Sequence, residues 1–100
     1  MNLTDAERRH LRSLAHPRKP VVTLGRHGLS EAVLAELEQA LAHHELVKVK
    51  VGIGDRDARA EVIHDMCERT GAELVQRIGH VATLFRRNPE APKVSLEPVS

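Results

Sequence analysis

Aromatic residues are nearly absent from this 100-residue chain, which has one phenylalanine and neither tryptophan nor tyrosine. Exposed aromatic rings are a main device by which proteins stack unpaired bases, so this composition disfavours that mode of recognition. The single cysteine, Cys67, excludes an internal disulfide, and no stretch has the length and hydrophobicity of a signal-peptide core or a membrane span. We therefore expect a cytoplasmic protein that contacts no membrane, with a core of leucine, valine, isoleucine and alanine.

Charge is small overall but unevenly distributed along the chain. The formal net charge is +1. Residues 1–28 contain six basic and two acidic side chains, residues 29–75 contain five and ten, and residues 76–100 contain four and two. The three segments therefore carry +4, −5 and +2, which predicts separate basic and acidic surfaces.

Hydrophobic spacing predicts one two-layer α/β domain over residues 1–87, with the element order α-β-α-β-α-β-β. Two of the later helices should cover one face of a four-stranded mixed sheet and leave the other face partly open. The strand–helix–strand unit requires parallel strands, whereas Gly79 and His80 suit a type II′ turn between antiparallel strands. Residues 88–100, with three prolines, are predicted to form an extended or flexible tail. Helices are expected at about 5–15, 30–43 and 58–70, and strands at 21–24, 46–51, 74–78 and 81–86.

Helix ends carry recognisable signals. Thr4 and Glu7 fit a capping box at the start of the first helix. Ser30 and Asp57 are predicted to cap the second and third helices, and Gly71 to end the third. These residues fix the expected boundaries to within about two residues.

The connection after the first strand has the composition of an anion-binding loop. Gly25 and Gly28 bracket Arg26 and His27 just before a helix N-terminus, where amides and the helix dipole favour a negative charge. A second interpretation stays open, because two glycines also join a strand to a helix for purely steric reasons. Further cations nearby would extend the loop into a track for several phosphates of a nucleic acid. They are Arg8 and Arg12 on the expected outer face of the first helix, Arg18 and Lys19 before the first strand, and Lys48 and Lys50 on the second.

Catalytic and metal sites are not predicted. The seven histidines are scattered, Asp55 and Asp57 lack the rest of a calcium loop, and Cys67 lies on a buried helix stripe. The phosphate-binding motifs of nucleotide enzymes are absent. We therefore expect no enzyme, no cofactor and no metal. The alternatives are a protein-binding adaptor that uses the open sheet face around Leu46 and, third, a small anion-dependent enzyme.

Three segments resemble a known family: residues 14–31 (LAHPRKPVVTLGRHGLSE), 44–51 (HELVKVKV) and 70–86. Over residues 3–87 the chain resembles the CRM domain, the chloroplast RNA splicing and ribosome maturation module, and is similar to its single-domain, YhbY-like bacterial members. The resemblance implies a fold related to the C-terminal domain of translation initiation factor three. It also implies binding to structured ribosomal RNA in precursors of the large ribosomal subunit. The RNA-contacting loop of the family corresponds to residues 25–28, with basic surroundings at Arg18, Lys19, Lys48 and Lys50. Nothing in the sequence demands self-association, so we expect a monomer.

Overall fold

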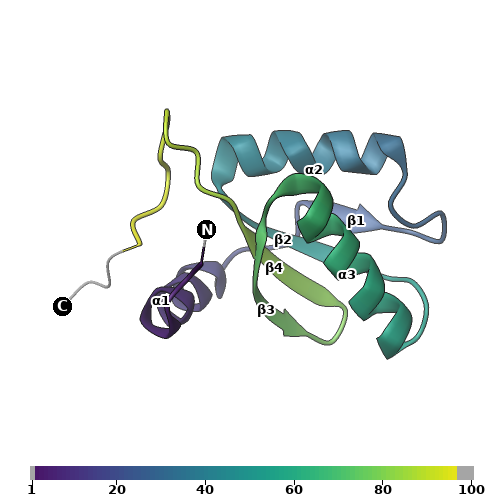
Figure 1. Cartoon of the computed structure of the whole chain (residues 1–100). Coiled ribbons are helices and arrows are strands. Elements are labelled where there is room, and N and C mark those ends of the chain that lie inside the picture. Colours follow the sequence, from purple (N-terminus) through teal and green to yellow (C-terminus); the bar gives the residue numbers. More distant parts are fainter. Residues whose placement is uncertain (1, 97–100) are drawn as a thin grey trace.

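A four-stranded mixed sheet forms the centre of the computed structural model, which describes residues 2–96 (Figure 1). The strand order is β1-β2-β4-β3, with β1 and β2 parallel and the other pairs antiparallel. The expected α/β class and element order are therefore confirmed. No helix within residues 2–96 is long and apolar enough to cross a membrane. The elements are α1 (Asp5–Ala15), β1 (Val22–Leu24), α2 (Glu31–His44), β2 (Leu46–Val51), α3 (Arg56–Thr70), β3 (Glu73–Ile78) and β4 (Val81–Phe85).

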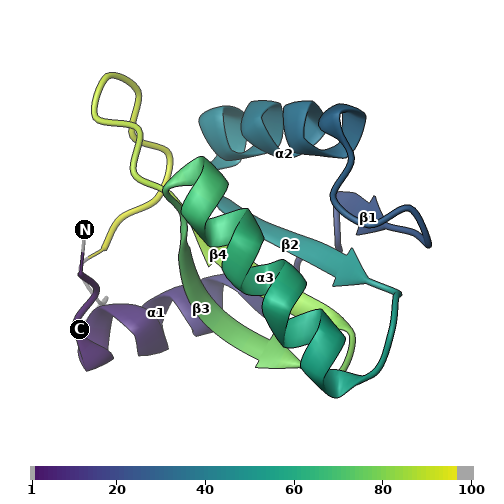
Figure 2. The same cartoon turned by 45° about the vertical axis from the view of Figure 1, so that its right-hand side comes forward.

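The alternation along β2 divides the sheet into two faces. Val47, Val49 and Val51 point to one face, and Leu46, Lys48 and Lys50 point to the other, because successive side chains of a strand alternate. The valine face is covered by α2 and α3, as expected (Figures 1 and 2). Burial of these branched side chains is the main stabilising term of the domain. Members of this core from the two helices are Leu37, Leu41, Ile63 and Met66.

The opposite face is partly covered by α1 and by the segment that follows β4. Leu11 and Ala15 of α1 pack with Leu46 and Phe85 of the sheet and with Val94 of the C-terminal segment. Leu46 is therefore only 1% exposed, and the expectation that an open surface surrounds Leu46 is wrong. The cause is α1, which lies across this part of the sheet instead of standing beside it (Figure 2).

Glu45 connects α2 to β2 and holds the C-terminal segment in place. The Glu45 side chain is fully buried, and its backbone has φ +61°, a conformation that costs a non-glycine residue about 1–3 kcal/mol. Its carboxylate accepts hydrogen bonds from the backbone N–H groups of Asn88 (2.5 Å), Lys93 (2.6 Å) and Val94 (2.9 Å) and lies 3.3 Å from Arg87 Nη1. Residues 88–96 contain no helix or strand, yet three of their backbone N–H groups donate to one carboxylate, which holds the segment in place.

The pKa of Glu45 reflects two opposed effects. Burial by itself raises the pKa, because a charged carboxylate loses its hydration. The three backbone N–H groups and the Arg87 guanidinium outweigh burial and lower the pKa below its ordinary value. Glu45 is therefore ionised in the folded protein at neutral pH.

The helix ends agree with the sequence at most positions. The capping box of Thr4 and Glu7 is present, Ser30 caps α2 by accepting from Val33 N–H, and Gly71 ends α3 with φ +74°. Gly79 has φ +56°, as a type II′ turn requires at that position. The assignment of Asp57 as the cap of α3 is wrong: Asp55 accepts the Ala58 N–H, and Asp57 lies within the first turn.

Candidate nucleic-acid interface

The β1–α2 loop, residues 25–30, leaves the sheet at the carboxyl end of β1 and is open to solvent. The Gly28 N–H donates to the Gly25 carbonyl (3.0 Å), which closes a tight turn with Arg26 and His27 at its tip. Both side chains are exposed. Gly28 has φ +67°, so the turn needs a residue that tolerates a left-handed conformation. The loop therefore presents one guanidinium and one imidazole to solvent from a constrained turn.

Several amides of this loop and of the adjoining helix are already used within the protein. Gly28 N–H is engaged in the turn, Ser30 N–H donates to the Gly28 carbonyl, and Val33 N–H is capped by Ser30. Glu31 places a negative side chain in the first turn of α2. The attraction of this end of α2 for an anion is therefore reduced, and the Arg26 side chain becomes the main cationic donor of the loop.

Lys50 lies beside the loop through the strand pairing. It is paired with Thr23 in β1, one residue before β1 ends, and its side chain is exposed on the α1 face of the sheet. The next strand pair is Leu24 with Val51, after which the β1–α2 loop begins. The parallel register therefore brings Lys50 close to the loop.

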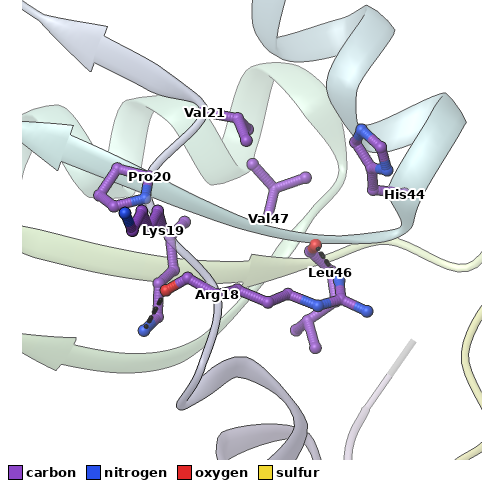
Figure 3. A pocket seen from close by; sticks show the side chains of 8 residues that line it. Arg18, Lys19, Pro20, Val21, His44, Leu46 and Val47 are labelled. Atoms are coloured by element: carbon purple, nitrogen blue, oxygen red, sulfur yellow. Dashed lines mark hydrogen bonds between the residues drawn. The ribbon is translucent and has the colours of Figure 1, made fainter.

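A second group of cations surrounds a pocket of about 370 Å³ at the other end of β1 (Figure 3). Arg18 Nη1 donates to the Leu46 carbonyl (2.8 Å), and Lys48 Nζ donates to the carbonyls of Arg18 (3.0 Å) and His16 (3.4 Å). Lys19 is exposed at the rim. We call this hollow the edge pocket. Its lining residues are Arg18, Lys19, Pro20, Val21, His44, Leu46, Val47 and Lys48.

The short first strand explains this arrangement. β1 begins at Val22, and Val21 N–H bonds to the Lys48 carbonyl, so the Leu46 carbonyl lies beyond the reach of β1. Arg18 supplies the donor that β1 does not. Lys48 places its charge against the carbonyl of His16, the C-cap of α1, where a cation is favoured, and against the carbonyl of Arg18 in the turn that follows. Arg18 and Lys48 therefore stabilise the fold through these hydrogen bonds, whereas the exposed Lys19 ammonium is available to bind a ligand.

The two cationic groups lie at the two ends of one edge strand. β1 is three residues long, which corresponds to about 10 Å of extended chain. Arg26, His27 and Lys50 are at its carboxyl end, and Arg18, Lys19 and Lys48 are at its amino end. The structure thus brings most of the candidate residues to the β1 edge of the sheet.

Arg8 and Arg12 do not join this edge. The expectation that Arg8 lies on the outer face of α1 is wrong, because its guanidinium donates to the Leu74 carbonyl and lies 3.6 Å from the Glu73 carboxylate in β3. Arg12 is half-buried on the same helix. Both views show α1 at the end of the sheet away from the β1–α2 loop (Figures 1 and 2). The spacing of residues along the helix could not predict this contact, because the long arginine side chain reaches a strand 66 residues away in sequence.

The β2–α3 loop, residues 52–55, was not predicted to belong to the site, but it contacts the end of β1 and the β1–α2 loop. Gly52 N–H donates to the Leu24 carbonyl (3.1 Å), and Ile53 lies close to Gly28. Among residues 2–96, no cluster of three or more histidine, cysteine, aspartate or glutamate side chains has the arrangement of a metal site. The exposed guanidinium and ammonium groups of this edge are suited to electrostatic contact with phosphates.

Comparison with known proteins gives consistent matches over nearly the whole chain. The family model of the CRS1 / YhbY (CRM) domain matches residues 3–86. The chain is 42% identical to a probable RNA-binding protein of Pseudomonas aeruginosa, over 93% of this chain and 89% of that protein. It is 47% identical to an RNA-binding protein of Haemophilus influenzae, over 89% and 90% of the two chains. The solution structure of a Staphylococcus aureus protein, described as a candidate RNA-binding protein, superposes with a TM-score of 0.83 at 33% identity and covers 96% of this chain.

Proposed function

The chain belongs to the CRS1 / YhbY (CRM) domain family, and we propose that it binds structured RNA through the β1 edge of its sheet. The observation that carries the proposal is the exposed turn with Arg26 and His27 at its tip, next to Lys50. RNA backbones present closely spaced phosphates, and a rigid turn with a guanidinium can bind one of them with two hydrogen bonds. The RNA-binding names of the similar proteins support the same conclusion.

Binding in this proposal is electrostatic and tolerant of sequence. Arg26 binds one phosphate, Lys50 and Lys19 neutralise its neighbours along the edge, and His27 donates a hydrogen bond. Arg18 and Lys48 add positive potential although part of their hydrogen-bonding capacity is used within the protein. Contacts of this kind position a protein on folded RNA but carry little base specificity. Phe85, the chain's only aromatic residue of the Phe, Tyr and Trp type, is fully buried, so stacking on such a ring is not part of the mechanism.

We further propose that the RNA is ribosomal RNA in precursors of the large subunit, and that the protein acts there as a non-catalytic, monomeric assembly factor in the cytoplasm. The support is the resemblance to the ribosome maturation module together with a surface that recognises phosphates rather than one base sequence. A factor that binds a folded precursor needs shape and charge complementarity more than base readout.

The test is a salt titration of binding to purified large-subunit ribosomal RNA. Each lost phosphate contact should lower the slope of log K against log salt by roughly 0.7–0.9. Integrated from about 1 M to about 0.1 M salt, that slope change corresponds to an affinity loss of about five- to eightfold. Arg26→Glu should show at least this loss, because it also introduces repulsion.

Arg69→Glu is the matched control, since Arg69 is an exposed arginine in the last turn of α3. It changes the net charge by the same amount as Arg26→Glu. Equal binding by wild type and Arg26→Glu at moderate salt would refute the role of the loop.

A protein-binding adaptor remains the second candidate, on one observation. Ile78 is 66% exposed on the part of the α1 face that α1 leaves uncovered, beside a pocket of about 240 Å³. An apolar interface there would bind almost independently of salt, whereas RNA affinity should fall steeply. Loss of a protein partner with Ile78→Ser, without change in RNA binding, would favour the adaptor. The pocket is lined by His16, Pro20, Lys48, Gln76, Ile78, Val81 and Thr83.

A further inference from the structure

We propose that the RNA interface has a second arm, formed by Arg56 and Arg59 at the start of α3 and by Arg77 of β3. The inference rests on the proposed function, because it assigns these arginines to phosphates of the same RNA that the β1–α2 loop contacts. It extends the interface from the β1 edge across the end of the sheet. We call these three residues together the arginine arm.

Three connections converge at this end of the sheet. The β2–α3 loop contacts the β1–α2 loop, because a side-chain carbon at Gly28 would lie 3.9 Å from Ile53 Cδ1. The turn of the β3–β4 hairpin is tied to the end of β2, since Val51 N–H donates to the His80 carbonyl (2.6 Å). Both views show the β1–α2 loop and the β2–α3 loop at the same end of the sheet (Figures 1 and 2). A ligand that reaches Arg26 therefore approaches the start of α3.

Hydrogen bonds position the side chains of Arg77 and Arg59 without using up their donors. Arg77 Nη2 donates to the Arg56 carbonyl (2.9 Å), which ties β3 to the first turn of α3. Arg59 Nη1 donates to the Gly54 carbonyl (2.9 Å). Arg56 is exposed to solvent. A guanidinium has several N–H groups, so each arginine keeps donors for a phosphate.

Arg59 is under-satisfied in the free protein. Its Nε is buried and has no acceptor within residues 2–96. A buried donor without a partner costs about 1–3 kcal/mol. Reorientation of the guanidinium toward a phosphate would give Nε an acceptor, which is a gain that a fully solvated surface arginine does not have.

The charge around the arginine arm is positive. Arg56, Arg59 and Arg77 give three positive charges against the two of Asp55 and Asp57, a balance of 3 − 2 = +1 over residues 55–59 and 77. The Asp55 carboxylate is engaged with the Ala58 N–H.

The remaining acidic residues of α3 follow further along the helix, at Glu61, Asp65 and Glu68. The start of α3 is therefore neutral by charge count and becomes net positive with Arg77 of β3, while its later turns carry these three acidic residues against Arg69. Electrostatics of this kind orient the helix with its first turn toward a polyanion.

The experiment measures binding of purified large-subunit ribosomal RNA over a salt series, with neutral substitutions. Arg56→Gln removes an exposed guanidinium that makes no hydrogen bond or ion pair within residues 2–96, so it should leave the fold intact, as circular dichroism will verify. The slope of log K against log salt should fall by roughly 0.7–0.9 for Arg56→Gln and about twice that for Arg56→Gln with Arg77→Gln. Affinity at about 0.1 M salt should fall about five- to eightfold for each lost contact.

Arg69→Gln on the last turn of the same helix is the control and should change neither the slope nor the affinity beyond a small net-charge effect. If wild type binds in an Arg26-dependent way while Arg56→Gln and the double variant match Arg69→Gln, the arginine arm is refuted and the proposed function stands. If wild type shows no salt-dependent binding to the RNA, the proposed function fails and the arm fails with it.

Discussion

Replacing Glu45 by glutamine should destabilise the domain far more than replacing any exposed glutamate. The carboxylate accepts from Lys93 and Val94 N–H at one oxygen and from Asn88 N–H at the other, so both oxygens are needed as acceptors. Glutamine keeps one acceptor oxygen and turns the other into a donor that faces an N–H group. The variant loses a hydrogen bond to a charged acceptor, worth about 1.5–3 kcal/mol, and leaves a buried donor unpaired at about 1–3 kcal/mol. We expect the free energy of unfolding to fall by about 2.5–6 kcal/mol.

The effect should depend on pH in a defined direction. Because the folded-state pKa of Glu45 is lowered, its stabilisation is complete above the unfolded value of about 4.5 and is lost as the pH falls through the lower folded value. The difference between wild type and Glu45→Gln should therefore be constant near neutral pH and shrink in acid. Urea unfolding is followed by far-ultraviolet circular dichroism, because the chain has no tryptophan or tyrosine for fluorescence.

Glu90→Gln provides the control, since Glu90 is an exposed residue in the same segment and undergoes the same change of charge. Amide exchange of Asn88, Lys93 and Val94 should accelerate in Glu45→Gln and stay unchanged in Glu90→Gln. Equal stability of Glu45→Gln and Glu90→Gln, at neutral pH and in acid, would show that the carboxylate does not hold the segment.

Two further predictions concern single sites. Gly54→Ala should lower the free energy of unfolding by more than about 1 kcal/mol, because φ is +65° and the added carbon would lie 2.6 Å from Ala58 Cβ. In the control Gly25→Ala the added carbon meets nothing within 4 Å, so stability should change by less than about 0.5 kcal/mol. Thermal unfolding of both variants measures the difference, and equal losses would contradict the steric argument. Burial raises the pKa of the Cys67 thiol, and the carboxylates of Glu73 and Glu68 raise it further. Iodoacetamide should therefore modify Cys67 more slowly than a free cysteine at mildly alkaline pH. Mass spectrometry follows the reaction, and a rate as fast as that of free cysteine would contradict the raised pKa.

Local patterns in the sequence predicted the helices and strands, but they could not predict contacts between residues that are distant in the sequence. The alternation at residues 46–51 predicted β2 with its observed bounds and its two faces, because a half-buried strand needs that pattern. Asp55 and Asp57 both precede the third helix, and only their position relative to Ala58 N–H distinguishes the cap. The local signal was ambiguous at that point.

Glu45 shows where such reasoning ends. A helix joined to a strand by a single residue usually has glycine there, so glutamate at φ +61° is a local exception. Its four partners lie 42–49 residues further along the chain, outside any periodic pattern. Arg8 was misplaced for the same reason, because its partners are in β3. The residues of the β1–α2 loop were identified because glycine spacing is a local signal.

The bond from Arg18 to the Leu46 carbonyl also bears on how the protein behaves at high concentration. A strand edge with free carbonyls is a template on which a second chain can add a strand and begin to aggregate. Here β2 is covered only from Val21, whose N–H bonds to the Lys48 carbonyl, and the Arg18 guanidinium donates to the Leu46 carbonyl that lies beyond it. The Arg18 side chain adds positive potential to this edge, and it also hinders the addition of a strand from a second chain.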